Sequence, residues 1–272
     1  MGGISIDPTT LVGIIAALAF VIIGFVLKHG HLASLFVPAA IAVVFGCTLC
    51  SAFATLTAKE IPQVLKSLRV LVGKQTKHPT EMIEEIVMLA EKARREGLLF
   101  LENYLEQVDD NYLRKGIQLV IDGVEPEVVR GVLETELYSL EERHKVAQDF
   151  YESAGSYAPT MGIAGAIMGL IVALGSISDP DILGPAIAAA FVATLYGVVF
   201  ANCVCFPIAT KLKNLHRKET MMRELILEGV LALQAGNNPI IIRERLNSFL
   251  RPADSNGKDK ASPEEADRET AI

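Results

Sequence analysis

Four long apolar stretches, each free of Asp, Glu, Lys and Arg, limit what this chain can fold into. They are Thr9–Leu27, Leu35–Thr57, Ala158–Ser178 and Leu183–Thr210. A helix rises about 1.5 Å per residue, so each stretch is long enough to cross a hydrocarbon core of about 30 Å. The sequence therefore predicts an all-α membrane protein with four transmembrane helices.

None of the four stretches contains an acidic or basic side chain that binds and releases a proton. Ion-coupled transporters normally place such groups on their pathway, which argues against a self-contained channel or transporter. If the chain belongs to an ion pathway, the titrating group must come from another polypeptide.

The charges outside the spans predict their orientation. Leu56–Tyr157 holds 13 basic and 19 acidic residues and Lys211–Ile272 holds 11 and 10, whereas the turn Lys28–Ser34 holds one Lys and Ile177–Ile182 has no basic residue. Basic residues near the ends of spans remain on the cytoplasmic side. We expect both large polar regions and both termini in the cytoplasm.

Motifs for catalysis are missing from the sequence, which has no phosphate-binding Gly-rich loop, no HExxH and no nucleophile elbow. Cys47-Thr-Leu-Cys50 has the CxxC spacing, but its apolar surroundings disfavour a thiolate, so the thiols are interpreted as small hydrophobic groups. His29-Gly-His31 is interpreted as a solvated turn rather than a pair of ligands. We expect no enzymatic activity, no cofactor and no metal site.

The polar regions are predicted to be helical. Thr80 can cap a helix whose apolar positions recur with helical spacing as far as Ala90, and Leu98–Val108 and Tyr112–Ile121 form shorter amphipathic pieces. Pro126 suits the first turn of a long helix that has no strong breaker before Gly155 and Pro159. Span four is predicted to run through Pro207 into Lys211–Ala235, and a last helix, Ile240–Leu250, follows the break at Gly236–Pro239.

These patterns divide the chain into five parts. They are a transmembrane hairpin (1–57), a large cytoplasmic helical domain between spans two and three (58–157), a second transmembrane hairpin (158–210), a cytoplasmic C-terminal helical segment (211–251) and a disordered tail (252–272). The tail prediction rests on its polar, Pro-punctuated composition.

Small residues form ridges along spans three and four. In span three these ridges are Ala158/Gly162/Ala166 and Gly165/Gly169/Ala173, and in span four Ala186/Ala190/Thr194 and Ala189/Ala193/Gly197/Ala201. Such ridges let helix backbones approach closely in lipid. A ring of copies, or a ring around a partner helix, would use them; tight packing within one bundle is the alternative.

The chain resembles the MotA family of flagellar stator subunits, relatives of TolQ and ExbB, over nearly its whole length. The resemblance rests on the two-plus-two spans and on several motifs: Tyr157-Ala-Pro-Thr-Met-Gly162, Gly165-Ala-Ile-Met-Gly169, Ala189-Ala-Phe-Val-Ala-Thr-Leu-Tyr-Gly197, Phe206-Pro-Ile-Ala-Thr-Lys211 and Ala93-Arg-Arg-Glu-Gly-Leu-Leu-Phe-Leu-Glu102. It implies a pentamer in the bacterial inner membrane around a dimer of the single-span partner MotB. The partner would supply the membrane Asp, and the ring would turn against the rotor protein FliG. Beyond these proteins and lipid, we expect no nucleic acid and no small molecule other than the coupling ion.

The same resemblance implies roles for individual residues. Pro159 and Pro207 match prolines at the partner-facing ends of spans three and four, with simple helix termination as the alternative. The hydroxyl of Thr194 would face the ion pathway, unless it bonds back to a carbonyl one turn earlier. Arg94 and Glu102 match rotor-contacting charges, with Arg95 as an equally placed candidate; a solvated helix face is the alternative.

Two points stay open at this stage. A TolQ-like or ExbB-like energiser of an outer-membrane system shares the mechanism, but four spans and the Arg94–Glu102 segment favour a stator.

Sodium-driven members of the family usually have a Thr where this chain has Ala166, and a dehydrated Na⁺ needs several oxygen ligands. The missing hydroxyl predicts coupling to protons.

Overall fold

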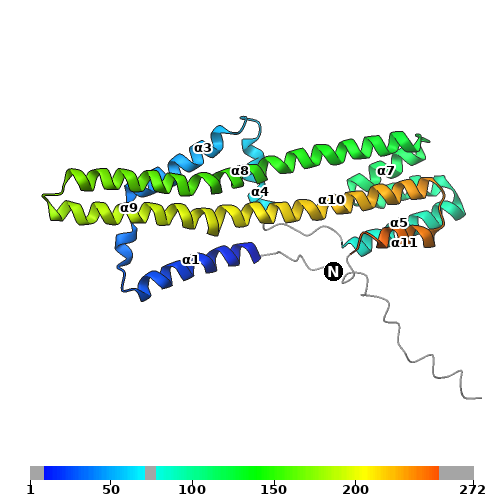
Figure 1. The fold of residues 1–272 in the computed structure, drawn as a ribbon. Helices are drawn as coiled ribbons and strands as arrows, with labels where there is room; N and C mark the ends of the chain where they lie inside the picture. The colour runs from blue at the N-terminus through cyan, green and yellow to red at the C-terminus, as the bar shows by residue number, and fades with distance from the viewer. Residues whose placement is uncertain (1–8, 71–77, 251–272) are drawn as a thin grey trace, which may run out of the picture. The chain divides into compact units, whose positions relative to one another are not determined.

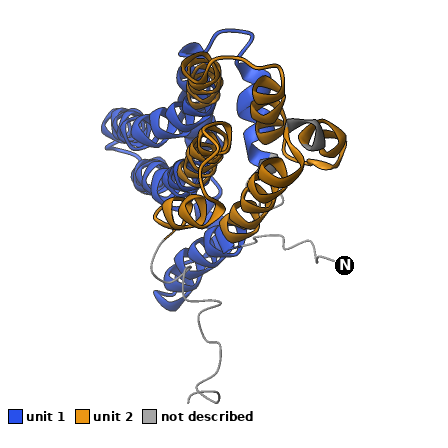
Figure 2. Cartoon of the chain, turned by 90° about the vertical axis from the view of Figure 1, so that its right-hand side faces the viewer, with its two compact units in different colours: residues 1–75, 142–216 blue, residues 76–141, 217–272 orange. Residues whose placement is uncertain are grey.

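The computed structural model describes residues 9–70 and 78–250, and every element of secondary structure in these ranges is helical (Figure 1). The chain divides into two compact units (Figure 2). Unit 1 comprises Met1–Gln75 and Glu142–His216, and unit 2 comprises Thr76–Glu141 and Arg217–Ile272. Each unit has its own clusters of buried apolar side chains.

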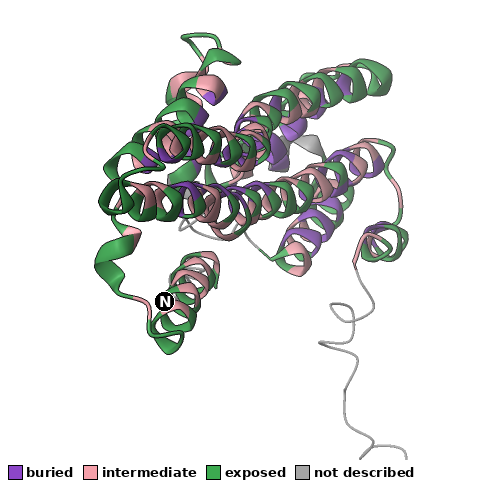
Figure 3. Ribbon diagram, turned by 60° about the vertical axis from the view of Figure 1, so that its left-hand side comes forward, coloured by how far each residue is buried: buried purple, intermediate pink, exposed green. Residues whose placement is uncertain are grey.

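Four helices in the described ranges are long and apolar enough to cross a membrane, which confirms the predicted fold class. Helix α1 (Thr9–Leu27) coincides with the first predicted span. It has no buried residue and its mean hydropathy is 2.9. Figure 3 shows its surface as exposed or intermediate throughout. A helix that is apolar all round belongs in lipid or against other helices, so this surface is available to either.

The second span is less regular than predicted. After the 3-10 turn η1 (Leu32–Leu35), it consists of α2 (Pro38–Ile41), the π-helical segment η2 (Ala42–Cys47) and α3 (Thr48–Ala54). Pro38 takes the first helical position, where its missing N–H would have no partner anyway, so the helix begins there and not at Leu35. The sequence of η2, Ala42–Cys47, has no pattern that predicts a π-helical turn.

The predicted long helices are confirmed. Helix α8 (Pro126–Gly175) continues through Pro159, and α9 (Pro180–Phe200) continues through the π-helical segment η4 (Ala201–Cys205) into α10 (Phe206–Gln234). Gly236, with φ +69°, ends this run before α11 (Pro239–Asn247), which is shorter than the predicted helix. The tail predicted to be disordered, from Pro252 onward, lies outside the described residues.

The core of unit 1 outside the spans contains a helix that the sequence analysis missed, α4 (Ile61–Val70). Its Val64 is buried in a cluster with residues of α8 and α10, among them Phe150 and Leu212. The side-chain amide of Gln63 donates a hydrogen bond to the carbonyl of Arg143 on α8. This helix therefore packs against the two long helices.

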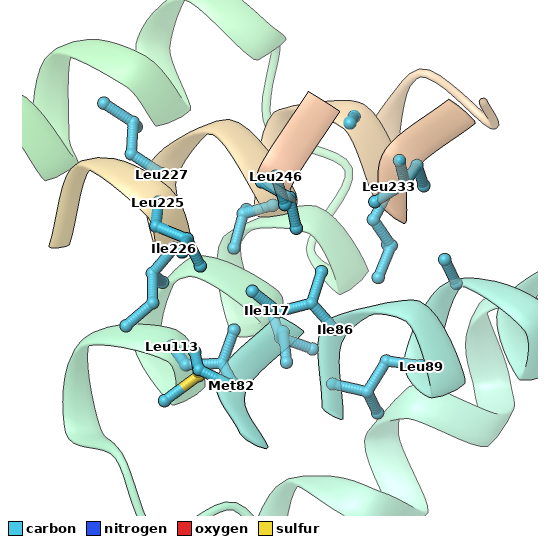
Figure 4. Close-up of a cluster of buried hydrophobic side chains, with 14 of the residues drawn as sticks. Met82, Ile86, Leu89, Leu113, Ile117, Leu225, Ile226, Leu227, Leu233 and Leu246 are labelled. Carbon is cyan, nitrogen blue, oxygen red and sulfur yellow. The ribbon is translucent and has the colours of Figure 1, made fainter. Parts of the chain in front are cut away.

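Unit 2 is built from α5 (Pro79–Glu96), α6 (Leu98–Tyr104), the 3-10 turn η3 (Leu105–Gln107), α7 (Asn111–Ile121), α11 and its parts of α8 and α10. The apolar face predicted for α5 is confirmed: Met82, Ile83, Ile86, Val87, Leu89 and Ala90 are all buried. Figure 4 shows three of these residues facing Leu113, Ile117 and side chains of α10 and α11.

The predicted cap of α5 is wrong. His78, not Thr80, occupies the N-cap position. Pro79 suits the first helical position, so α5 begins two residues earlier than a cap at Thr80 would allow. By contrast, Asp110 caps α7, since its side chain accepts hydrogen bonds of 2.9 Å from the backbone N–H groups of Tyr112 and Leu113.

Tyr112 ties three helices of unit 2 together. Its side chain is 1% exposed, and its hydroxyl donates a 3.0 Å hydrogen bond to the carbonyl of Leu133 on α8. The guanidinium carbon of Arg223 on α10 lies 4.8 Å from the centre of the Tyr112 ring. Burial raises the pKa of Tyr112 to about 12, so the phenol stays neutral and remains a donor at all physiological pH values.

We predict that Tyr112→Phe lowers the free energy of unfolding of the purified protein in detergent by about 1 kcal/mol at pH 7, because a buried hydrogen bond is lost. The wild type should also lose stability as pH rises from 10 towards 12, since its unfolded state binds fewer protons there, and the variant should lose less. Tyr138→Phe, at a site 63% exposed, is the control. Equal stability of the two variants would contradict the role of the hydroxyl.

Candidate functional site

The membrane parts of α8 and α9 touch through their backbones. A Cβ added to Gly197 would lie 2.5 Å from the carbonyl oxygen of Ala158 and 3.1 Å from the Cα atoms of Pro159 and Gly162. One added to Gly169 would lie 2.9 Å from the Cβ of Ala190. The small residues on the facing sides of α8 and α9 therefore pack against each other within one chain. This is the alternative of tight packing within one bundle.

The second ridge of span three is packed in the same way. A Cβ on Gly165 would lie 2.9 Å from the Cβ of Ala193 in the same chain, so this ridge is already occupied. What the pair leaves exposed is a set of large apolar side chains: Ile163, Ile167, Met168, Ile171 and Leu174 on α8 and Ile187, Phe191 and Val198 on α9. Lipid or other polypeptides must cover these larger side chains.

Pro159 lies beside this backbone contact and does not end its helix. Proline has no N–H to donate, so the carbonyl of Gly155 one turn earlier loses its usual helical partner. Gly155 itself faces the ring of Phe206 on α10, whose nearest atom would lie 2.8 Å from an added Cβ. A weakened helical turn is thus placed where α8 meets the start of α10.

Pro207 is also inside a continuous helical run, directly after the π-helical segment η4. The N–H of Phe206 bonds to the carbonyl of Ala201, five residues earlier, which is the π-helical pattern. The wider turn accommodates a proline that cannot donate to Cys203. Helix termination, the alternative for both prolines, is therefore excluded.

A groove of about 610 Å³ opens beside Pro207, between α1 and the η4–α10 segment of unit 1. Its lining mixes apolar and polar side chains: Thr9, Thr10, Gly13, Ile14, Ala17, Asn202, Cys203, Phe206, Pro207, Thr210, Lys211 and Asn214. Asn202 donates a 2.9 Å hydrogen bond to the carbonyl of Val198. Pro207 therefore borders a groove that holds amide, hydroxyl and ammonium groups.

Thr194 and Ala166 lie on the packed pair itself. The Thr194 hydroxyl donates a long, 3.4 Å hydrogen bond to the carbonyl of Ala190, one turn earlier, as the alternative interpretation required. Its Cα would lie 3.3 Å from a Cβ on Gly162, one turn before Ala166 on α8. Both side chains are half-buried. A weak internal hydrogen bond leaves the hydroxyl able to exchange partners.

The predicted rotor-facing charges lie on α5 and α6 of unit 2, on either side of the turn at Gly97. Arg94 and Arg95 are exposed in the last turn of α5, and Glu102 is exposed on α6. Gly97, with φ +83°, turns the chain between the two helices, and Leu101, fully buried, holds α6 in the core. The three charged side chains are free to meet a partner without unfolding the unit.

The chain matches known proteins over most of its length. Residues 104–225 match the MotA/TolQ/ExbB proton channel family, and residues 11–97 match the motility protein A N-terminal family. It is 39% identical to motility protein A of Bacillus subtilis, covering 91% of this chain and 92% of that protein. It is 36% identical to chemotaxis protein PomA of Vibrio alginolyticus, covering 90% and 95%.

Two solved structures share the fold. One is the flagellar MotAB stator complex from Bacillus subtilis, with a TM-score of 0.85 and 39% identity over 92% of this chain and 98% of that chain. The other is MotAB of C. jejuni, with a TM-score of 0.85 and 26% identity over 90% and 96%. Both matches include membrane helices and polar regions together.

We predict that Gly197→Ala destabilises the purified protein by about 1–3 kcal/mol, because the new methyl group would meet a backbone carbonyl that cannot move aside. Gly184→Ala on the same helix is the control, since nothing lies within 4 Å of its added Cβ. Thermal unfolding in detergent measures both. Equal melting temperatures would show that α8 and α9 separate easily.

Proposed function

The chain belongs to the MotA/TolQ/ExbB proton channel family, and on that premise we propose how its parts turn ion flow into torque. It is a stator subunit of the bacterial flagellar motor and a multi-pass protein of the inner membrane. The four spans without an acidic or basic group are the observation that carries the proposal. A subunit of this kind needs a partner that brings the proton-binding group into the membrane.

The partner in this proposal is a dimer of a MotB-type protein, surrounded by five copies of this chain. The solved relatives are MotAB complexes, which supports a partner of this type and an oligomer. The helical turns around Pro159 on α8 and Pro207 on α10 would face the partner. We assign Thr194 to the ion pathway, where its hydroxyl would bond to the partner carboxylate or to a passing water.

The coupling ion in this proposal is the proton. A proton needs one oxygen to bind and a chain of waters to travel along, whereas Na⁺ requires a cage of oxygen ligands. Ala166 supplies no hydroxyl to such a cage, while Thr194 supplies one. The N-terminus, 58–157 and 211–251 would lie on the cytoplasmic side, where basic residues flank the spans.

We predict that cells in which this chain and its MotB-type partner form the only stators swim in sodium-free medium and stop when a protonophore is added. The physical reason is the missing oxygen ligand at Ala166. Swimming speed at varied external sodium and constant proton-motive force is the measurement. A speed that follows sodium would overturn the choice of ion but not the assignment as a stator.

Torque in this proposal passes through the exposed corner formed by α5 and α6. Arg94, with Arg95 beside it, and Glu102 would contact the rotor protein FliG. Exposed charges of opposite sign give an interface its registry and its rate of association, while contributing little to folding.

We predict that Arg94→Glu and Glu102→Lys each reduce swimming speed while the protein stays in the membrane and co-purifies with its partner. Asp149→Lys, an exposed reversal on α8 in unit 1, is the control and should leave swimming unchanged. Swimming speed and partner recovery are measured on the same strains. If a reversal removed the protein from the membrane, that residue would be structural.

A further inference from the structure

Two histidines that are 72 positions apart in the sequence meet in unit 1. The Nδ1 atoms of His144 on α8 and His216 on α10 are 3.3 Å apart. Their ring centroids are 5.4 Å apart, and the ring planes are nearly perpendicular, at 84°. Both side chains are half-buried, so water reaches the pair.

Packing on either side holds the pair in place. Ala147, one turn after His144, and Leu212, one turn before His216, are buried in the same apolar cluster. Lys213 and Glu152 form an ion pair between the same two helices. The two imidazoles are therefore brought together by helices that are fixed for other reasons, which lowers the entropic cost of binding a shared ligand.

The separation of the two nitrogens suits a metal ion. Two nitrogens that bind one tetrahedral Zn²⁺ at about 2.0–2.1 Å lie about 3.3 Å from each other. Imidazole nitrogen is a preferred ligand of Zn²⁺, Cu²⁺ and Ni²⁺. Binding would require both rings as Nε2–H tautomers, so that both Nδ1 lone pairs are available.

We propose that His144 and His216 form a two-histidine site for a divalent transition-metal ion of the zinc class, which bridges α8 and α10. In the described parts of the chain no group of three or more His, Cys, Asp or Glu residues could hold a metal, so water completes the coordination. Arg143, Lys145 and Arg217 flank the pair in sequence, and their charge opposes a cation. The site is therefore open and of modest affinity.

The first experiment is a zinc titration of the complex purified with its partner in detergent, after stripping with a chelator and in competition with a chromophoric chelator. We expect about one ion per copy of this chain. His144→Gln and His216→Gln should each weaken binding by about tenfold or more, while His78→Gln, at the exposed N-cap of α5, should not. Zinc should raise the melting temperature of the wild type and of His78→Gln, but not that of His144→Gln or His216→Gln. Unchanged binding in both Gln variants would mean adventitious surface binding and would overturn the site.

A second measurement needs no variant, which covers the case in which the Gln variants fail to fold. The unmodified complex is loaded with Cu²⁺, and its electron paramagnetic resonance spectrum is recorded. Coupling to two imidazole nitrogens supports the site. A spectrum with no nitrogen coupling, or with coupling to a single nitrogen, means that the histidines only hydrogen-bond to each other and overturns the proposal.

Discussion

The backbone contact between Gly162 on α8 and Gly197 on α9 determines how the membrane part of this chain is organised. Lipid tails are as apolar as leucine, so no hydrophobic force drives helices together within the bilayer. Close approach of the backbones, which only small residues permit, replaces that force. Because both inward faces are occupied by each other, assembly with other copies or with a partner must use the outward faces, where Ile171 and Phe191 are exposed. The small-residue ridges alone are thus no evidence for a ring, and the case for an oligomer comes from the solved relatives.

The irregular turns of the long helices lie where the sequence has proline, and neither proline ends its helix. Pro159 removes one hydrogen bond from α8, and Pro207 follows a π-helical turn that absorbs the loss on the α9–α10 run. Gly155 and Phe206 bring the two irregular regions into direct contact. Helical turns with fewer hydrogen bonds are easier to bend than regular ones. We infer that this pair of defects is the place where spans three and four bend most easily.

Much of this architecture follows from the sequence, because span length and helical periodicity are local signals. The first span was predicted to the residue, and the six buried positions of α5 were predicted by their spacing. The two π-helical turns were missed because an extra residue in a helical turn has no distinctive local signal. Helix α4 was missed although it is amphipathic, like the predicted helix Tyr112–Ile121. The pairing of His144 with His216 depends on how α8 packs on α10, and that is a tertiary fact with no trace at a separation of 72 residues. The partner-facing and rotor-facing residues were reached through the resemblance, because exposed charges such as Arg94 look like any solvated helix face.

The distribution of charge separates the spans of this chain from its polar regions. The spans contain no acidic or basic group, so in our proposal the partner supplies the group that binds the proton. The exposed charges at the α5–α6 corner, in turn, are far in sequence from any span and sit on a unit with a complete core of its own. The boundaries between the two units fall inside the sequence ranges of α8 and α10. Because each unit has its own cluster of buried apolar side chains, we infer that a surface substitution in one unit leaves the core of the other intact.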